Sequence, residues 1–142
     1  MKRRGPGLRN QGGFTLVELI VVMVILGLIA GFVYVNYMGK LPEQKIKAAK
    51  TQIEIFNQAL ELYHLDTGQY PTTEQGLNAL RENPGVDNWA GPYLKKDVPN
   101  DPWRRPYHYQ SPGSHGDYDL SSYGDDGSPG GEGKNQDINS WE

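Results

Sequence analysis

The stretch Gly12-Gly13-Phe14-Thr15-Leu16-Val17-Glu18 joins a short basic leader to an unbroken apolar run over residues 19–35. Glu18 is the one charged residue between positions 14 and 35. On insertion scales, an acidic residue inside a membrane-length apolar stretch costs about 2.5–3.5 kcal/mol, so such a residue normally has a partner. The stretch therefore predicts a membrane helix that carries one charge in need of neutralisation.

Cleavage of the chain after Gly13 would create that partner. The new amino group of Phe14 would lie about one helical turn from the Glu18 carboxylate. In a bilayer, the amine and the carboxylate could neutralise each other within one chain or between two neighbouring chains. The sequence leaves both arrangements open.

Two simpler interpretations of the N-terminus explain less. An ordinary secretory signal peptide has an apolar core of about 7–15 residues followed by a small-x-small cleavage site. Here the apolar run is longer, and Ala30-Gly31 is followed by further apolar residues. A plain single-pass anchor accounts for the length of the run but not for Glu18.

The charge of the chain changes sign across the apolar run. The 142 residues carry a net charge of −3, and the leader holds four basic residues and no acid, so the chain after Gly13 carries −7. This asymmetry predicts a cytoplasmic leader with the remainder outside. We expect no nucleic-acid partner, because Lys45, Lys47 and Lys50 resemble a solvated helix face. The basic leader residues are Lys2, Arg3, Arg4 and Arg9.

The chain divides into a leader (residues 1–13), an apolar helix (14–38) and a remainder (39–142) that begins with a second helical pattern at 43–65. Pro42, between the two patterns, either kinks one helix or starts another. We favour a single long helix with a weak point there. The second pattern has one apolar stripe at three- and four-residue steps, made of Ile46, Ala49, Ile53, Phe56, Leu60 and Tyr63.

We expect residues 66–142 to form a small domain that packs on that apolar stripe. Thr72 or Thr73 begins a short helix that buries Leu77 and Leu80. Residues 107–109 and 118–120, joined through Ser111-Pro112-Gly113, predict a short antiparallel hairpin. The expected fold is therefore α+β, a long N-terminal helix packed on a small C-terminal domain with short antiparallel strands.

The last stretch, residues 124–142, has no periodicity but carries two acidic positions separated by a glycine-rich loop, Asp125-Asp126 and Asp137. Carboxylates and exposed backbone carbonyls suit Ca²⁺, although the spacing is not that of an EF-hand. The alternative is a solvated acidic loop. The glycine content of the loop adds to the argument for calcium, because such a loop needs something to offset its ordering entropy, but the residues alone leave both interpretations open. The chain also lacks cysteine, so no disulfide can hold the domain.

No catalytic constellation accompanies these features. His64, His108 and His115 lie in different segments without metal-ligand spacing, and no serine sits in a nucleophile elbow. We therefore expect a structural protein rather than an anchored enzyme or binding protein. Gly27-x-x-x-Gly31 either marks a close helix contact or arises by chance.

The basic leader, the Gly13-Phe14 junction and Glu18 as the fifth residue after it resemble the class III signal peptides of type IV pilins and type II secretion pseudopilins. The likeness continues to Trp141, and over this length the chain is similar to the major pseudopilins of type II secretion systems. The segments that carry it are residues 69–77, 93–96, 98–103, 106–109, 112–113, 118–120, 124–127 and 137–141.

This resemblance implies a protein of the bacterial inner membrane with a periplasmic domain. A prepilin peptidase/methyltransferase would cut between Gly13 and Phe14 and methylate the Phe14 amine. An inner-membrane assembly platform would add the subunit to a filament of identical copies and minor pseudopilins, with Glu18 needed for assembly. That filament would push folded proteins through the outer membrane. The alternative is a minor pseudopilin or a type IV or competence pilin.

The resemblance also implies a calcium site in place of the C-terminal disulfide of type IV pilins. Asp126 and Asp137 would supply side-chain oxygens, Tyr123 and Ser128 would supply backbone oxygens, and Asp125 is a possible extra ligand.

The chain departs from the family pattern at two places. Val35 stands near where the apolar helix often has proline, so any local unwinding there must involve other residues. Arg104 stands where glycine commonly follows Asp-Pro-Trp, and Arg105 comes next. We expect two exposed arginines, which would alter contacts between subunits.

Overall fold

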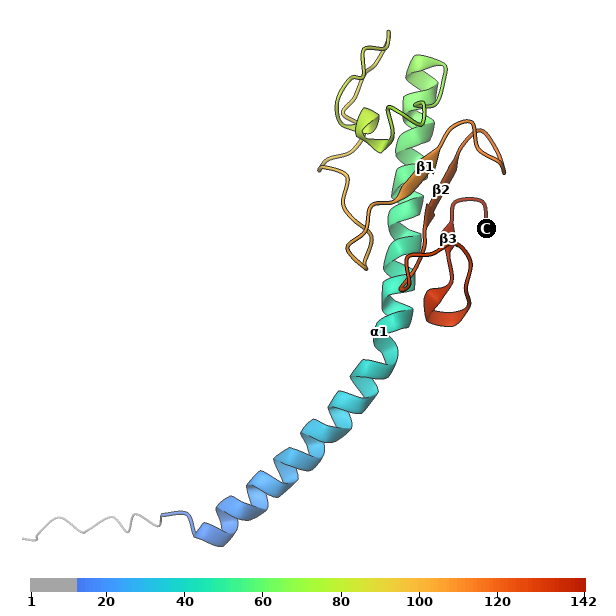
Figure 1. Ribbon diagram of the computed structural model, residues 1–142. Coiled ribbons are helices and arrows are strands. Elements are labelled where there is room, and N and C mark those ends of the chain that lie inside the picture. Colours follow the sequence, from blue (N-terminus) through green and yellow to red (C-terminus); the bar gives the residue numbers. More distant parts are fainter. Residues whose placement is uncertain (1–12) are drawn as a thin grey trace, which may run out of the picture. The chain divides into compact units, whose positions relative to one another are not determined.

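A computed structural model describes residues 13–142, apart from the side chains of residues 38 and 39 (Figure 1). The predictions for residues 1–12 of the leader lie outside this range. The chain forms two compact units that meet between Gly39 and Lys40, and each is described by itself. The elements in chain order are α1 (Leu16–Thr67), the 3-10 helix η1 (Leu77–Leu80), β1 (His108–Gln110), β2 (Asp119–Ser122), the 3-10 helix η2 (Gly133–Asn135) and β3 (Ile138–Asn139).

The first unit is the apolar part of α1. The 22 residues Leu16–Tyr37 are long and apolar enough to cross a membrane, and none of this span is buried inside the structure. At 1.5 Å per residue such a helix is about 33 Å long, which matches a hydrocarbon core of about 30 Å. The polar side chain of Asn36 is satisfied on its own helix, where Nδ2 donates to the Phe32 carbonyl at 2.9 Å. The whole length of the span is therefore available to lipid or to other chains.

Helix α1 contains both helical patterns, because Pro42 lies inside its bounds. In the second unit the predicted stripe faces the core, with Ile46 partly buried at its start. Full burial of a large apolar side chain is worth about 1.5–3 kcal/mol. The buried core consists of Ala49, Ile53, Phe56, Ala59, Leu60 and Tyr63 from α1, and Leu77, Ala79, Leu80, Leu94, Tyr107, Leu120 and Ile138 from the rest of the unit.

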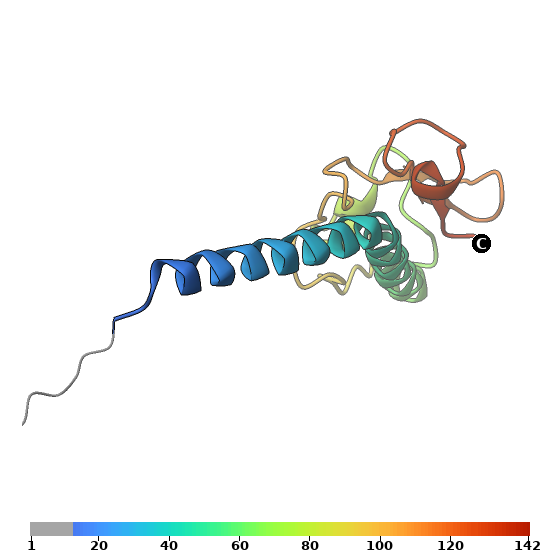
Figure 2. The same cartoon turned by 90° about the horizontal axis from the view of Figure 1, so that it is seen from below.

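The C-terminal part of the unit flanks α1 on two sides (Figures 1 and 2). The strands lie on one side and the irregular segment of residues 70–105 on another. Aromatic contacts join both sides to the helix. Tyr107 packs edge-on against Phe56 with ring centroids 5.1 Å apart, and Tyr93 packs edge-on against Tyr63 at 5.6 Å.

The three strands form an antiparallel sheet in the order β1-β2-β3. The predicted hairpin is present, but its strands lie one residue further along the chain, because the ladder pairs His108 with Ser121 and Gln110 with Asp119. Tyr107 falls just before the ladder and is buried instead. β3 was not predicted, since a two-residue strand is too short to show alternation. The predicted α+β class is confirmed.

The helix start predicted at Thr72 or Thr73 is present at Thr72 as a capping box. The backbone N–H of Thr72 donates to Gln75 Oε1 at 2.9 Å, and that of Gln75 donates to Thr72 Oγ1 at 3.3 Å. A regular α-helix does not follow, because Gly76 has φ 58° and ψ −165°, outside the helical region. The chain instead forms the four-residue η1, which buries Leu77 and Leu80 as expected.

Candidate functional site

The start of α1 is built around Thr15. Its Oγ1 accepts a hydrogen bond from the Glu18 backbone N–H at 3.2 Å, and its carbonyl accepts from Leu19 N–H at 3.2 Å. Thr15 is therefore the N-cap, and Thr-x-x-Glu is the pattern of a capping box. A carboxylate in the first turn is also favoured by the helix dipole. This cap was not predicted, although the Thr-x-x-Glu spacing of residues 15–18 is visible in the sequence.

The carboxylate of Glu18 remains free of partners within residues 13–142, because the cap uses its backbone N–H and not its side chain. Phe14 is 85% exposed. A Cβ placed on Gly13 would meet nothing within 4 Å. Residues 13–142 therefore give no packing reason for glycine at position 13, and they leave Phe14 and Glu18 exposed.

The predicted metal residues lie in one C-terminal loop that closes on itself. Gly124 has φ 63°, and a Cβ there would come within 2.6 Å of the Gln136 carbonyl oxygen, so the two ends of the loop are in close contact. Asp125 N–H donates to the Lys134 carbonyl at 3.4 Å, and Gly127 N–H donates to the Tyr123 carbonyl at 3.2 Å. These contacts bring residues 123–137 into a single compact turn.

The two main predicted carboxylates have different surroundings. Asp126 is exposed, and its Oδ1 accepts from the Ser128 N–H at 3.1 Å. Asp137 accepts from the Gly130 N–H through Oδ2 at 2.7 Å, whereas its buried Oδ1 has no hydrogen-bond donor among residues 13–142. Asp125 Oδ2 faces the Lys134 ammonium at 3.8 Å, which makes it the least available of the three carboxylates.

Side chains alone do not form a ready metal cluster. Within the described part of the chain, no group of three or more His, Cys, Asp or Glu side chains lies close enough to hold a metal ion. A calcium site of the predicted kind draws on backbone carbonyls as well as carboxylates. The buried, unpartnered Oδ1 of Asp137 is the one feature of the predicted ligands that calls for a cation or a donor.

A second cluster holds this loop and was not predicted. Arg105 reaches the loop with its guanidinium: Nη1 donates to the Gly124 carbonyl at 2.8 Å and Nη2 to the Asp125 carbonyl at 3.0 Å. The expectation of two exposed arginines is therefore wrong for Arg105, whose side chain is partly buried by these contacts, while Arg104 is exposed. Such pairings lie about twenty residues apart in the chain, beyond the reach of a local motif.

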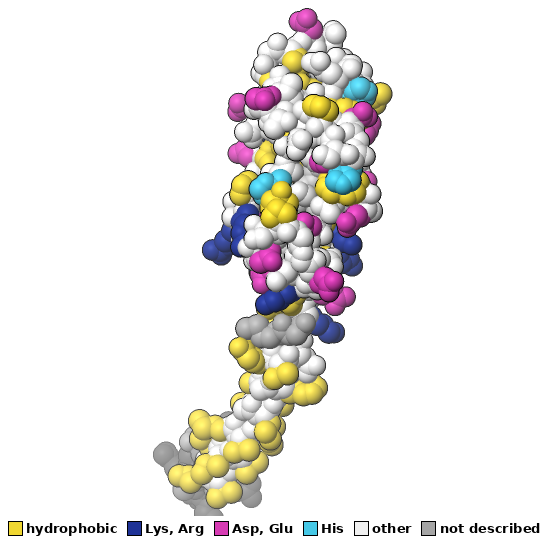
Figure 3. Space-filling model, turned by 45° about the vertical axis from the view of Figure 1, so that its right-hand side comes forward, with side chains coloured by type: hydrophobic (Ala, Val, Ile, Leu, Met, Phe, Trp, Pro, Cys, Tyr) yellow, Lys and Arg dark blue, Asp and Glu magenta, His cyan; other side chains and the backbone are white. Residues whose placement is uncertain are grey.

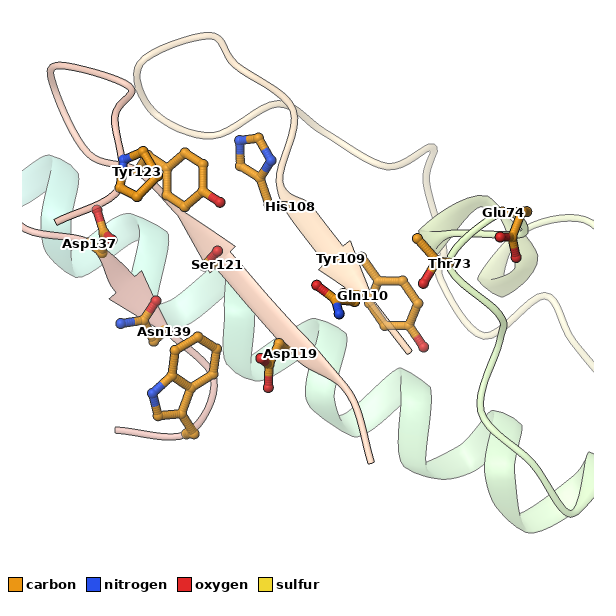
Figure 4. A pocket seen from close by; sticks show the side chains of 12 residues that line it. Thr73, Glu74, His108, Tyr109, Gln110, Asp119, Ser121, Tyr123, Asp137 and Asn139 are labelled. Atoms are coloured by element: carbon orange, nitrogen blue, oxygen red, sulfur yellow. The ribbon is translucent and has the colours of Figure 1, made fainter. Parts of the chain in front are cut away.

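A shallow groove of about 580 Å³ lies on the open face of the sheet (Figure 4). Tyr123 and Asp137 lie at one end of it and Glu74 at the other. His108 stacks on Tyr123 with ring centroids 4.0 Å apart, and His115 stacks on Trp141 at the same distance. The groove therefore carries aromatic pairs that fix neighbouring segments to the sheet.

Asp119, in the middle of this groove, caps the hairpin loop. Its oxygens accept from the backbone N–H groups of Ser114 and His115 at 2.9 and 3.0 Å, and Oδ2 lies 3.0 Å from the His115 ring. Partial burial alone would raise the pKa of the Asp119 carboxyl, but these hydrogen bonds hold it below its ordinary value. The histidine and carboxylate of the groove thus serve the fold of the hairpin.

Arg104 has a backbone φ of 69°, in the left-handed region. A non-glycine residue there costs roughly 1–2 kcal/mol, while glycine gives back about 0.5–1 kcal/mol through the entropy of the unfolded chain. We expect Arg104→Gly to raise the free energy of unfolding by about 0.5–1 kcal/mol and the Tm by about 2–8 °C, measured by thermal unfolding in detergent. Asn88→Gly is the control, since Asn88 has φ 61° but asparagine tolerates this region. A lower Tm for Arg104→Gly would contradict the strain.

The helix start and the small α+β unit together define a class, the type IV pilin-like proteins with an N-terminal methylation signal. Residues 8–34 match the family model described as the prokaryotic N-terminal methylation motif. Residues 36–141 match the model described as type II secretion system (T2SS), protein G. The chain therefore belongs to the type II secretion system protein G family, and it is a structural subunit of the major pseudopilin type.

Named relatives and a solved structure agree with this assignment. Type II secretion system core protein G of Pseudomonas aeruginosa is 45% identical over 139 residues, which cover 94% of this chain and 97% of the relative. The Vibrio cholerae protein of the same name is 45% identical over 138 residues and 94% of each chain. The crystal structure of the major pseudopilin of enterohaemorrhagic Escherichia coli matches with a TM-score of 0.62 and 35% identity, over 75% of this chain and 94% of that chain. The predicted family, and the major-pseudopilin interpretation over its alternatives, are confirmed.

Proposed function

We propose that the chain is the repeating subunit of a periplasmic pseudopilus, anchored in the inner membrane by the first part of α1. Residues 40–142 would lie in the periplasm. The observation that carries this proposal is Glu18, whose carboxylate has no partner among residues 13–142 and which stands at the start of an apolar span with no buried residue. Such a span must be covered by lipid before assembly and by neighbouring helices after it.

The first step is processing by a prepilin peptidase/methyltransferase. Cleavage after Gly13 exposes the amine of Phe14, which is then N-methylated. The open surroundings of Gly13 support a requirement imposed by an enzyme, because the fold itself tolerates a Cβ there. The exposed Phe14 is likewise accessible to a modifying enzyme.

The second step is assembly, in which Glu18 sets the register. An inner-membrane platform would move subunits from lipid into the filament alongside minor pseudopilins. In the apolar filament core, the Glu18 carboxylate of one subunit would pair with the Phe14 amine of the next. A subunit in the wrong register would leave a buried charge unpaired, which is strongly unfavourable, so it would be rejected. Growth of the filament would then push folded proteins through the outer membrane.

Calcium would hold the C-terminal loop of this subunit. The ligands would be the carboxylates of Asp126 and Asp137 and the carbonyls of Tyr123 and Ser128. Asp125 would be an additional ligand. Support comes from Asp137, because a buried carboxylate oxygen with no donor is unfavourable until a cation satisfies it. Bound Ca²⁺ would supply a cross-link between the two ends of a loop in a chain that has no cysteine.

Mass spectrometry of the chain purified from membranes tests the proposed processing. We expect a mature form that begins at Phe14 and carries one extra methyl group. Gly13→Val should leave uncut precursor, because a branched side chain would crowd the scissile bond. Gly27→Val is the matched control: Gly27 is equally free of neighbours but lies outside the junction, so cleavage should continue.

Cleavage near Ala30-Gly31, or a mature Gly13→Val chain that still begins at Phe14, would contradict the proposal. The number of copies in filaments sheared from cells separates a major from a minor subunit, since a major subunit should make up most of the filament mass.

A further inference from the structure

We propose that the turn of residues 101–105 is a clamp that holds the C-terminal loop in its calcium-binding shape before the metal arrives, with Arg105 as the positioning residue. This inference rests on the proposed calcium site and adds a residue that the proposed ligand set does not contain. The clamp is defined as Asp101 and Arg105 with the turn between them.

The contact between the clamp and the loop has three points. The guanidinium of Arg105 donates to the carbonyls of Gly124 and Asp125 at 2.8 and 3.0 Å, which is the two-pronged geometry that a guanidinium provides and an ammonium does not. The third point is Gly127, where a Cβ would come within 2.6 Å of Arg105 Cζ. Gly127 also has φ 67°, so the backbone favours glycine there, and a Cβ would displace the Arg105 guanidinium.

Asp101 fixes the clamp in turn. It is only 5% exposed, and its Oδ1 accepts from the backbone N–H groups of Arg105 and Trp103 at 2.8 and 3.0 Å. Its Oδ2 accepts from the buried hydroxyl of Ser122 at 2.6 Å. The backbone N–H of Asp101 donates to the Arg105 carbonyl at 2.7 Å. A buried carboxylate with this many donors holds a single geometry, so it fixes the backbone of Arg105.

The clamp meets the sheet where the loop begins. Ser122 is the last residue of β2, and Tyr123, whose carbonyl is a proposed calcium ligand, follows it directly. The two carbonyls held by Arg105 belong to the next two residues, between Tyr123 and Asp126. Arg105 therefore fixes the stretch that joins two proposed ligands. The carbonyls that it binds are not among the proposed calcium ligands.

Arg105 has two opposing effects on a cation. Its hydrogen bonds order part of the loop in advance, and preorganisation of this kind strengthens binding. Its positive charge repels Ca²⁺ and weakens binding. The ordering effect is the larger one, because the guanidinium is hydrogen-bonded to two carbonyls. The negative ends of their dipoles offset part of its positive charge. The two effects separate in Arg105→Lys, which keeps the charge but loses the two-pronged contact.

The test uses the full chain in detergent micelles, with two measurements. Calcium titration calorimetry should give a Kd at least tenfold higher for both Arg105→Ala and Arg105→Lys than for the unchanged chain. In chelator, amide hydrogen exchange of residues 124–137 should be at least tenfold faster in both variants. The control Arg104→Lys alters the exposed neighbouring arginine and should leave both values within twofold.

Equal or tighter calcium binding by Arg105→Ala would overturn the inference, because charge repulsion would then be the larger effect. Unchanged loop exchange in chelator would also overturn it. Absence of calcium binding by the unchanged chain would instead remove the proposed metal site, and the exchange measurement, made without metal, would still decide whether Arg105 holds the loop. A melting curve of each variant shows whether the core is intact.

Discussion

Glu18→Val should leave the chain inserted in the membrane and cleaved, yet abolish filament assembly and secretion. Valine makes the span more apolar, so insertion is unharmed or improved. Cleavage continues because the peptidase acts at Gly13. Assembly fails because the register-setting pair with the Phe14 amine is lost. Sheared filaments, the mature mass of the chain and secretion by a strain that carries only the variant measure the three outcomes separately.

The N-cap of α1 requires two further variants, because Glu18 is also part of the Thr15-x-x-Glu18 capping pattern. Glu18→Gln replaces the carboxylate with an amide that also suits this position but carries no charge, so it should fail to assemble as valine does. Thr15→Ala removes the capping hydroxyl at a cost of about 0.5–2 kcal/mol but keeps the charge, so it should still assemble. Normal filaments from Glu18→Gln would show that the charge is not needed, and failure of Thr15→Ala alone would assign the effect to the cap.

Removal of calcium should lower the Tm of the chain by about ten degrees or more. A ligand that binds only the folded state at a hundredfold excess over its Kd stabilises it by about 2.7 kcal/mol. For a unit the size of residues 40–142, each kcal/mol corresponds to roughly 4–8 °C. Thermal unfolding in detergent, with chelator and after addition of Ca²⁺, measures the shift. Mg²⁺ should restore it poorly, because it demands tighter octahedral geometry.

Variants of the proposed ligands sharpen this expectation. Asp126→Ala and Asp137→Ala should melt near the chelated value and should not respond to added Ca²⁺. Asp87→Ala is the control, since Asp87 is an exposed carboxylate outside the loop, and it should keep the full response. Asp119 is unsuitable as a control because it caps the hairpin loop. Identical curves with and without chelator, for a chain first shown to be metal-free, would favour a solvated acidic loop.

The parts of the fold whose apolar pattern repeats over many residues could be predicted from the sequence. Helix α1 follows from an apolar run and a stripe that repeat over many turns, and the structure buries that stripe. β3 could not be predicted, because its two residues form a strand only against Ser121 and Ser122 of β2. The short helix after Thr72 was predicted at its start but not in its form, since one glycine conformation ends the α-helical geometry.

The candidate site divides in the same way. Glu18 stands out in the sequence because it interrupts an apolar stretch, and Gly13 and Phe14 stand out because they join the basic leader to that stretch. The clamp depends instead on contacts across nineteen to twenty-one residues, Arg105 with Gly124 and Asp125, and Asp101 with Ser122. No local spacing announces such contacts.

The net charges on the two sides of the apolar span overstate the support for the predicted membrane orientation. Lys40, Lys45, Lys47 and Lys50 follow the span closely and equal the four basic residues of the leader in number. Because the positive-inside rule counts Lys and Arg near the ends of a span rather than net charge, the two flanks balance. The proposed orientation therefore rests on membership of the family and not on the charges alone.

The exposed apolar side chains of the span Leu16–Tyr37 (Figure 3) limit the environments in which this protein is stable. A subunit dissolved singly in water would present an apolar rod of 22 residues to the solvent, so that state is essentially unpopulated. Subunits can then be exchanged only between a bilayer and a filament in direct contact with it. We therefore expect a filament of such subunits to gain and lose subunits only at its membrane end, because no dissolved subunits are available to exchange with its middle.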